Sequence, residues 1–187
     1  CQPDIARLSD LSGNKVRVYD QSLANFVSSV GGTPVPLGFS EVQQSLARGV
    51  IDCAITGPSS ANTAGWPEET SNMLPIAFQI AVQGYGINLD TWNKFSPEDQ
   101  EKLQAAFDGL VSEIWAYSEE IFEDAVNCNV GEEPCETVKS YDLKLIPVSE
   151  EDKATMQSAL RDISFPGWKE ICDKVNPTCS EDWQKTV

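Results

Sequence analysis

The sequence predicts an α/β fold in which a mostly parallel sheet lies between helices. Three observations lead to this prediction. Between residues 15 and 60, segments in which apolar and polar residues alternate, as in strands, are followed by segments with helical periodicity. The last strand segment is a mostly apolar run, which is typical of a strand buried between helices. Turns rich in Gly, Pro and Ser separate the segments. Sheets of this class usually bind ligands beyond the carboxyl ends of their strands.

The first strand is predicted over residues 15–19. Its alternation places Val16 and Val18 on one face of the sheet and Arg17 on the other. A helix over residues 21–30 follows, with apolar side chains at helical spacing, and two consecutive glycines end it. Lys15, Arg17 and Tyr19 therefore share the face of the strand opposite Val16 and Val18.

Residues 33–38 contain two prolines, which favours an extended segment that is either an edge strand or a connection. Ser40 and Gln43 have the spacing of a capping box, so we expect a helix to begin at Ser40 and to end at a glycine. The apolar run of residues 50–55 then predicts a buried strand, and a Gly-Pro-Ser turn follows it.

The second half of the chain is predicted to be mainly helical. Alternation over residues 81–89 indicates a strand before a long helix, which Ser96 caps and which has proline at its first position. A stripe of apolar residues at helical spacing predicts a buried face on this helix. The stripe consists of Leu103, Phe107, Leu110, Ile114, Ile121 and Ala125.

The end of the chain is predicted to contain one more strand and two helices. The strand covers residues 141–148, and Ser149 caps the helix that follows. We expect the Pro166-Gly167 pair to separate this helix from a last one that begins near Trp168.

Several runs of residues resemble the second lobe of the DctP-type solute-binding proteins of TRAP (tripartite ATP-independent periplasmic) transporters. The runs are Asn-Lys-Val-Arg-Val at 14–18, Gly-Thr-Pro-Val-Pro-Leu-Gly-Phe-Ser-Glu-Val at 32–42, Gly-Val-Ile-Asp-Cys-Ala-Ile-Thr-Gly-Pro at 49–58, Asn-Thr-Ala-Gly-Trp at 62–66 and Gly-Ile-Asn-Leu-Asp-Thr-Trp at 86–92. The resemblance implies a periplasmic-binding-protein-like fold of two lobes, with the second lobe largely present and the first lobe incomplete.

The resemblance also implies how the chain is divided. Residues 1–80 would form the α/β unit of the second lobe. Residues 81–129 would supply the crossover strand and the long helix that return to the first lobe, and residues 130–187 the strand that rejoins the second lobe with the carboxyl-terminal helices. We expect no signal peptide within this chain, because no segment of that kind is recognisable.

The family's function implies a periplasmic protein that captures a small organic acid and passes it to TRAP membrane permease subunits. The composition agrees, because 13 basic and 29 acidic residues give a net charge of −16, which opposes binding to nucleic acid or to an anionic membrane. No run of about 18 apolar residues predicts membrane insertion.

Arg17 matches the family arginine that pairs with the substrate carboxylate. A guanidinium can hold a carboxylate through two parallel, charge-assisted hydrogen bonds. The resemblance places Thr56 where many relatives carry an asparagine that supports the ligand, so the identity of the substrate stays open. The remaining candidates for binding follow from the turns and the crossover between lobes. They are Phe39, Asn62, Trp66, Phe78 and Gln79.

Six cysteines predict disulfide bonds. Cys128 and Cys135 are separated by six residues, as are Cys172 and Cys179, and each pair brackets a turn with proline, so two local bridges are expected. Cys1 and Cys53 remain, although six cysteines permit 15 connectivities. The alternative is a zinc cluster, which the lack of histidine and of any Cys-x-x-Cys pair disfavours.

Two other classes of function stay open. Enzymatic activity is not expected, because a serine or cysteine nucleophile would lack a histidine base and no glycine-rich phosphate loop predicts a cofactor or nucleotide. A hydrolase that uses two carboxylates remains the weaker alternative. A sensor or protein-interaction module that uses the same cleft is the other alternative, and the sequence does not distinguish it from a transport protein.

Overall fold

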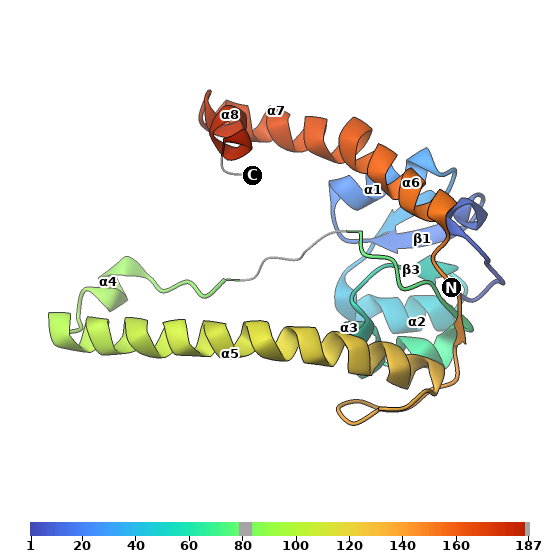
Figure 1. The fold of residues 1–187 in the computed structure, drawn as a ribbon, viewed down its shortest axis with the longest axis horizontal. Coiled ribbons are helices and arrows are strands. Elements are labelled where there is room, and N and C mark those ends of the chain that lie inside the picture. Colours follow the sequence, from blue (N-terminus) through green and yellow to red (C-terminus); the bar gives the residue numbers. More distant parts are fainter. Residues whose placement is uncertain (79–83, 186–187) are drawn as a thin grey trace.

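A parallel sheet of three strands lies towards one end of the computed structural model, which describes residues 1–78 and 84–185 (Figure 1). The strands are β1 (Lys15–Val18), β2 (Thr33–Pro36) and β3 (Cys53–Ala54), in the order β2-β1-β3. In the register, Arg17 of β1 lies beside Val35 of β2 and Ala54 of β3. The predicted α/β class and the edge position of the proline-containing strand are both confirmed.

Short helices connect these strands and follow them. They are the 3-10 helices η1 (Leu8–Leu11), η2 (Phe39–Glu41) and η3 (Trp66–Glu69), and the α-helices α1 (Gln21–Ser29), α2 (Val42–Ala47) and α3 (Pro58–Thr63). Gly31, just after α1, has φ +82°, and Gly49, just after α2, has φ +66°. Both glycines therefore adopt the left-handed conformation that ends helices.

Two clusters of buried apolar side chains lie on the two sides of the sheet. Val16 and Val18 pack with α1 and η1, and Leu46 and Trp66 belong to the cluster on the side of α2 and η3. The guanidinium of Arg17 lies 5.5 Å from the centre of the Trp66 ring, so it is on the second side. The alternation predicted for β1 is therefore confirmed.

Two predicted boundaries in this region are wrong. The helix does not begin at a Ser40 cap, because the Glu41 carboxylate accepts a hydrogen bond of 3.1 Å from Gly38 N and so starts the 3-10 turn η2 one residue earlier. The strand over residues 50–55 is reduced to Cys53–Ala54. The amide of Val50 instead donates to Ser45 O at 2.9 Å and completes the end of α2.

A second, smaller sheet joins the two halves of the chain. β4 (Asn72–Met73) pairs in parallel with β5 (Lys144–Leu145), so the strand predicted over residues 141–148 is shorter than expected. The amide of Tyr141 donates to Cys128 O at 2.7 Å, which ties the residues before β5 to a helix and not to a strand.

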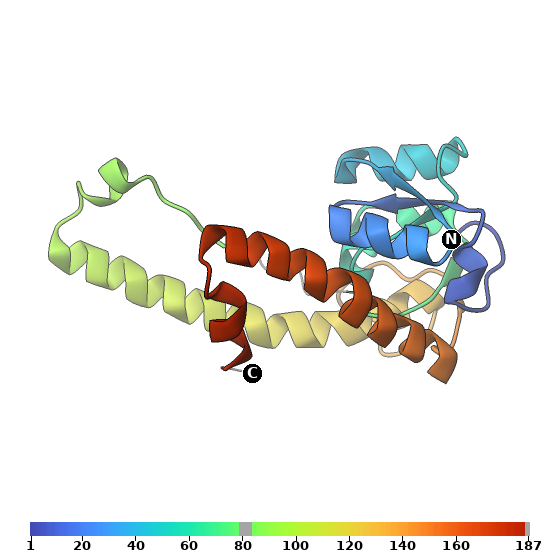
Figure 2. The same cartoon turned by 90° about the horizontal axis from the view of Figure 1, so that it is seen from above.

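The long helix α5 (Pro97–Val130) projects away from the sheet, with the short helix α4 (Leu89–Trp92) near its outer end (Figures 1 and 2). Ser96 caps it by accepting a hydrogen bond from Asp99 N, as predicted. The strand expected over residues 81–89 does not form in the part of it that the structure describes, residues 84–89. A strand needs a neighbouring strand, and none among the described residues pairs with this segment.

The buried face predicted on α5 is correct only near its carboxyl end. Ala125 is fully buried, whereas Phe107, Leu110 and Ile114 each remain about 40% exposed. These three residues lie well before the carboxyl end of α5, and the described part of the chain leaves them exposed. Helical spacing alone does not show whether a partner covers the apolar face.

The carboxyl-terminal helices form a second projection. α6 (Glu150–Ala159), the π-helical turn η4 (Leu160–Ser164) and α7 (Phe165–Val175) run on continuously, and α8 (Cys179–Gln184) follows (Figure 1). Ser149 caps α6 as predicted. Pro166 does not separate two helices, since it occupies the first turn of α7, where a missing amide is tolerated, and the π-turn precedes it.

Three disulfides are present, and the structure has no free cysteine. The predicted local bridges Cys128–Cys135 and Cys172–Cys179 both form. The third bridge joins Cys1 to Cys53 and ties the start of the chain to β3. Within residues 1–78 and 84–185, no helix has the length and apolar character needed to cross a membrane.

Candidate ligand-binding site

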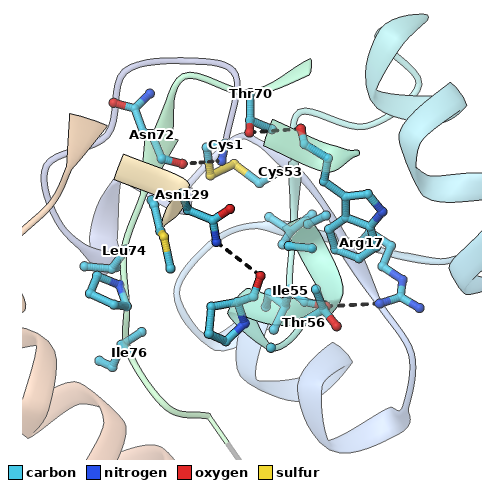
Figure 3. A pocket seen from close by; sticks show the side chains of 18 of the residues that line it. Cys1, Arg17, Cys53, Ile55, Thr56, Thr70, Asn72, Leu74, Ile76 and Asn129 are labelled. Carbon is cyan, nitrogen blue, oxygen red and sulfur yellow. Dashed lines mark hydrogen bonds between the residues drawn. A yellow bond between two sulfur atoms is a disulfide. The ribbon is translucent and has the colours of Figure 1, made fainter. Parts of the chain in front are cut away.

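A cavity of about 700 Å³ lies at the carboxyl ends of the sheet strands (Figure 3). Tyr19 directly follows β1, Phe39 comes shortly after β2, and Thr56 comes shortly after β3. All three residues line the cavity, together with apolar side chains of the segment around β4. The volume is within the range of small-molecule sites, and the position is the one expected for ligands of a parallel sheet.

Arg17 lies in the wall of this cavity and is only 3% exposed. Its Nε donates to Leu37 O at 3.1 Å and its Nη1 donates to Ile55 O at 3.0 Å (Figure 3 shows the second bond). These bonds hold the guanidinium between the segments that follow β2 and β3. Nη2 and the second hydrogen of Nη1 have no partner among the described residues, and together they form one fork of the kind that binds a carboxylate.

Three aromatic rings surround the guanidinium. Its central carbon lies 5.4 Å from the ring centre of Tyr19, 6.0 Å from that of Phe39 and 5.5 Å from that of Trp66. Phe39 and Trp66 also contact one another, with ring centres 5.2 Å apart. Contacts with ring faces stabilise a cation that has been removed from water.

The charge of Arg17 has no carboxylate partner within the described part of the chain. Burial lowers the pKa of its guanidinium from its ordinary value, and the negative form of Tyr19 opposes this effect. An arginine nevertheless stays protonated in proteins at neutral pH. The cavity therefore contains a fixed positive charge that an anion can neutralise.

Most of the other predicted binding residues also lie at the cavity. Thr56, Phe39, Trp66 and Phe78 line it. Phe78 has a packing role as well, because its ring meets Phe26 of α1 edge to face at 5.0 Å. Gln79 lies outside the described residues, so its place remains a prediction.

Asn62 is buried but is not among the residues that line the cavity. Its Nδ2 donates to Asn129 Oδ1 at 2.8 Å and to Lys139 O at 2.8 Å. The amide of Asn129 in turn donates to Pro58 O at 3.1 Å (Figure 3). The amide of Asn62 therefore joins α3 to the end of α5, and a contact between Asn62 and the ligand stays a prediction.

Tyr19, Ser60 and Asn129 are among the cavity residues that the sequence analysis did not name as site residues. Tyr19 is two residues beyond Arg17, so the strand alternation that points Arg17 to the cavity could have identified it. Ser60 follows β3 in the turn that begins α3. Asn129 had no local signal, because it reaches the site only when the end of α5 packs against α3.

No group of three or more His, Cys, Asp or Glu side chains suited to hold a metal ion occurs within residues 1–78 and 84–185. The fold and this cavity together define an α/β binding lobe whose site contains a buried arginine. The chain belongs to the family described as DctP, bacterial extracellular solute-binding protein, family 7, whose model matches residues 2–169.

Among curated proteins, a solute-binding protein of Chromohalobacter salexigens is 29% identical over 112 residues, which are 59% of this chain and 33% of that protein. A TRAP periplasmic solute-binding protein of Desulfovibrio salexigens, solved with bound orotic acid, gives a TM-score of 0.76 at 15% identity. That match covers 97% of this chain and 56% of the other.

A TRAP periplasmic solute-binding protein of Roseobacter denitrificans, solved with bound β-D-glucuronate, gives a TM-score of 0.64 at 25% identity, and the match covers 95% of this chain and 55% of the other. The chain thus spans a little over half the length of these solved relatives and, in its matched segment, about a third of the curated one.

Proposed function

We propose that the protein is an extracytoplasmic solute-binding protein that captures a small organic acid for a TRAP transporter. The observation that carries this proposal is the buried guanidinium of Arg17, which faces a cavity of about 700 Å³ and has no carboxylate partner among the described residues. Leaving a buried charge uncompensated is costly, so a site of this kind favours an anionic ligand.

The hydrogen bonds of Arg17 indicate how it holds the ligand. Leu37 O and Ile55 O fix the plane of the guanidinium before any ligand arrives. The free fork then donates to both oxygens of one carboxylate without a search through side-chain conformations. Family membership and the acids bound to solved relatives, orotic acid and glucuronate, support an organic acid as the ligand.

The partners follow from the same family. TRAP membrane permease subunits would receive the acid, and the protein would work in the periplasm. Binding would favour a closed state of a two-lobed protein, because ligand contacts on both sides are made only when the cleft is shut. The permease would then recognise the closed state.

Isothermal titration calorimetry tests the proposal with the protein as its full gene encodes it. The ligands are small organic acids, and the neutral amide of each acid serves as its control. We expect an acid to bind and its amide not to bind. Arg17→Ala should weaken binding of the acid by about 2 to 5 kcal/mol, because the pair of Arg17 and the carboxylate is removed from water.

Two further variants separate binding from folding. Arg17→Lys retains the charge but loses the planar fork, and we expect at least about tenfold weaker binding. Arg48→Lys changes an exposed arginine after α2 that does not line the cavity and should leave the affinity unchanged. Urea unfolding of each variant shows whether it is folded. Equal affinity of the wild type and folded Arg17→Lys and Arg17→Ala variants would reject the proposed function.

A further inference from the structure

We infer that Asn129, near the carboxyl end of α5, is a positioning residue for the ligand site. Its amide fixes the turn that follows β3, and this turn in turn fixes the guanidinium of Arg17. The inference rests on the proposed function and deepens it, because it names what holds the binding group in its orientation. The affinity for an acid would then depend on a contact between α5 and the α/β unit.

Arg17 and the turn after β3, residues 55–58, hold one another through two hydrogen bonds. Arg17 Nη1 donates to Ile55 O at 3.0 Å, and Ile55 N donates to Arg17 O at 3.3 Å. The guanidinium is planar and rigid, so the bond from Nη1 also sets the direction of its other donors. A shift of Ile55 O would therefore turn the fork that meets the carboxylate.

The sheet fixes only the start of this turn. β3 ends at Ala54, which lies beside Arg17, and the register contains no later pair among the described residues. Gly57 has no side chain that could hold the turn, and a methyl group at this position would meet no atom within 4 Å. Glycine also permits more backbone conformations than other residues. A hydrogen bond beyond Gly57 is therefore needed to anchor the turn.

Asn129 supplies this anchor at Pro58, the first residue of α3. Its Nδ2 donates to Pro58 O at 3.1 Å, and Figure 3 shows this bond close to Ile55 and Thr56. The amide is itself oriented, because Asn129 Oδ1 accepts a hydrogen bond of 2.8 Å from Asn62 Nδ2. A backbone carbonyl can only accept, so the nitrogen of Asn129 has to face Pro58. Asn129 is 1% exposed, so water does not compete for the bond.

The end of α5 is a firm support for this amide. Asn129 O accepts a hydrogen bond of 3.0 Å from Leu143 N, and Cys128 O accepts one of 2.7 Å from Tyr141 N. The bridge Cys128–Cys135 closes the loop that follows α5. Asn129 therefore connects a fixed helix end to the turn that holds the guanidinium.

Asn127 provides a matched control two residues earlier on α5. Its Nδ2 also donates to a proline carbonyl at 3.1 Å, that of Pro134, and neither residue lines the cavity. In isothermal titration calorimetry with the protein as its full gene encodes it, Asn129→Ala should weaken binding of the tightest organic acid at least about fivefold, because a bond that orients the binding group is lost. Asn127→Ala loses a bond of the same kind and should leave the affinity unchanged.

A double-mutant cycle shows whether Asn129 acts through Arg17. Arg17→Lys removes the planar group that Ile55 O orients. In this background, Asn129→Ala should weaken binding of the acid by less than about twofold, because the fork is already lost. A loss as large as in the wild-type background would mean that Asn129 contacts the ligand directly, and it would overturn the positioning role.

Hydrogen exchange of the guanidinium tests the same link without a ligand. In protein with isotope-labelled arginine, the NMR signals of Arg17 are those that Arg17→Lys removes. Asn129→Ala should speed exchange of the Nη1 hydrogens, which bond to Ile55 O, at least about fivefold. The Nε hydrogen bonds to Leu37 O and should exchange as in the wild type. Unchanged exchange at Nη1 would overturn the inference, since a purely structural role of Asn129 would not alter this bond.

The outcomes separate this inference from the proposed function. If binding depends on Arg17 but folded Asn129→Ala binds as tightly as the wild type, the inference is overturned and the proposed function stands. If no acid binds to the folded protein, the proposed function fails, and the exchange rates still decide whether Asn129 holds the guanidinium. Urea unfolding shows which variants are folded. Asn129→Ser, which retains a small polar side chain, replaces Asn129→Ala if that variant does not fold.

Discussion

The α/β unit and the long helix α5 contain similar apolar side chains but bury them very differently. Val16, Leu46 and Ile51 are fully buried around the sheet, whereas Leu110 on α5 is 40% exposed. The unit is therefore stabilised by its own core, while the outer part of α5 depends on backbone hydrogen bonds within the helix. The hydrogen bonds that hold Arg17 come from the unit, although Phe122 and Asn129 of α5 also line the cavity.

This comparison predicts the largest loss of stability from the disulfide that belongs to the unit. The bridge Cys1–Cys53 closes a separation of 52 residues, and Cys172–Cys179 closes a separation of 7. In the chain-entropy model, removing Cys1–Cys53 should lower the free energy of unfolding by about 4 kcal/mol, and removing Cys172–Cys179 should lower it by about 2.5 kcal/mol. Urea unfolding of the two Cys→Ala pairs measures both values, and equal costs would contradict the expectation.

A Leu→Ala substitution in the α/β unit and another on α5 compare how much a leucine contributes to stability in the two regions. Leu46→Ala opens a cavity in the core, and we expect a loss of about 3 kcal/mol in the free energy of unfolding. Leu110→Ala removes a half-exposed side chain from a helix that alanine also favours, and we expect a change below about 0.5 kcal/mol. A large cost at Leu110 would show that the projecting face of α5 is covered in the protein.

Sequence reasoning was most successful where local chemistry decides the structure. Three kinds of local feature were predicted correctly: the alternation around Arg17, the serine caps at Ser96 and Ser149, and the two short disulfide loops. Each depends on residues close together in the chain. The position of Arg17 in the cavity wall also agrees with the strand order, because the carboxyl ends of parallel strands meet at one edge of the sheet.

The errors occurred where the structure depends on contacts between segments that are far apart in the chain. Residues 84–89 alternate like a strand, but a strand forms only beside a partner that the local sequence does not reveal. The apolar stripe of α5 has the spacing of a buried face, yet its burial depends on what covers it. The hydrogen bond between Asn62 and Asn129 likewise depends on the packing of α5 against α3, which no local signal reveals.

The contact between the two regions predicts a smaller effect. Asn129 is 1% exposed and joins α5 to Pro58, next to the cavity. Asn129→Asp removes the donor to Pro58 O and places a carboxylate against that carbonyl. We therefore expect the free energy of unfolding to fall by about 2 kcal/mol. Asn25→Asp, at an exposed position on α1, is the matched control and should change the free energy of unfolding by less than about 0.5 kcal/mol.

The smallest predicted effect concerns pH. Hydrogen bonds from the Thr137 hydroxyl and from Glu136 N lower the pKa of Asp124 below its ordinary value of 3.8, against the effect of burial. This stabilisation is therefore complete above the unfolded-state pKa and is lost as the pH falls through the lower, folded-state pKa.

Urea midpoints measured between about pH 2 and pH 6 test this dependence. Asp124→Asn should show a shallower loss of stability below about pH 4 than the wild type. Asp108→Asn, at an exposed position on α5, serves as the control and should follow the wild type. Identical pH profiles for Asp124→Asn and the wild type would contradict the assignment.

The central claim is that Arg17 holds the carboxylate of an organic acid. A crystal structure of the protein with the acid that binds most tightly in calorimetry tests it most directly. We predict that the two carboxylate oxygens lie about 2.7 to 2.9 Å from Nη1 and Nη2 of Arg17, while Leu37 O and Ile55 O keep their present bonds. A carboxylate bound elsewhere, with Arg17 contacting only the two carbonyls, would contradict the claim.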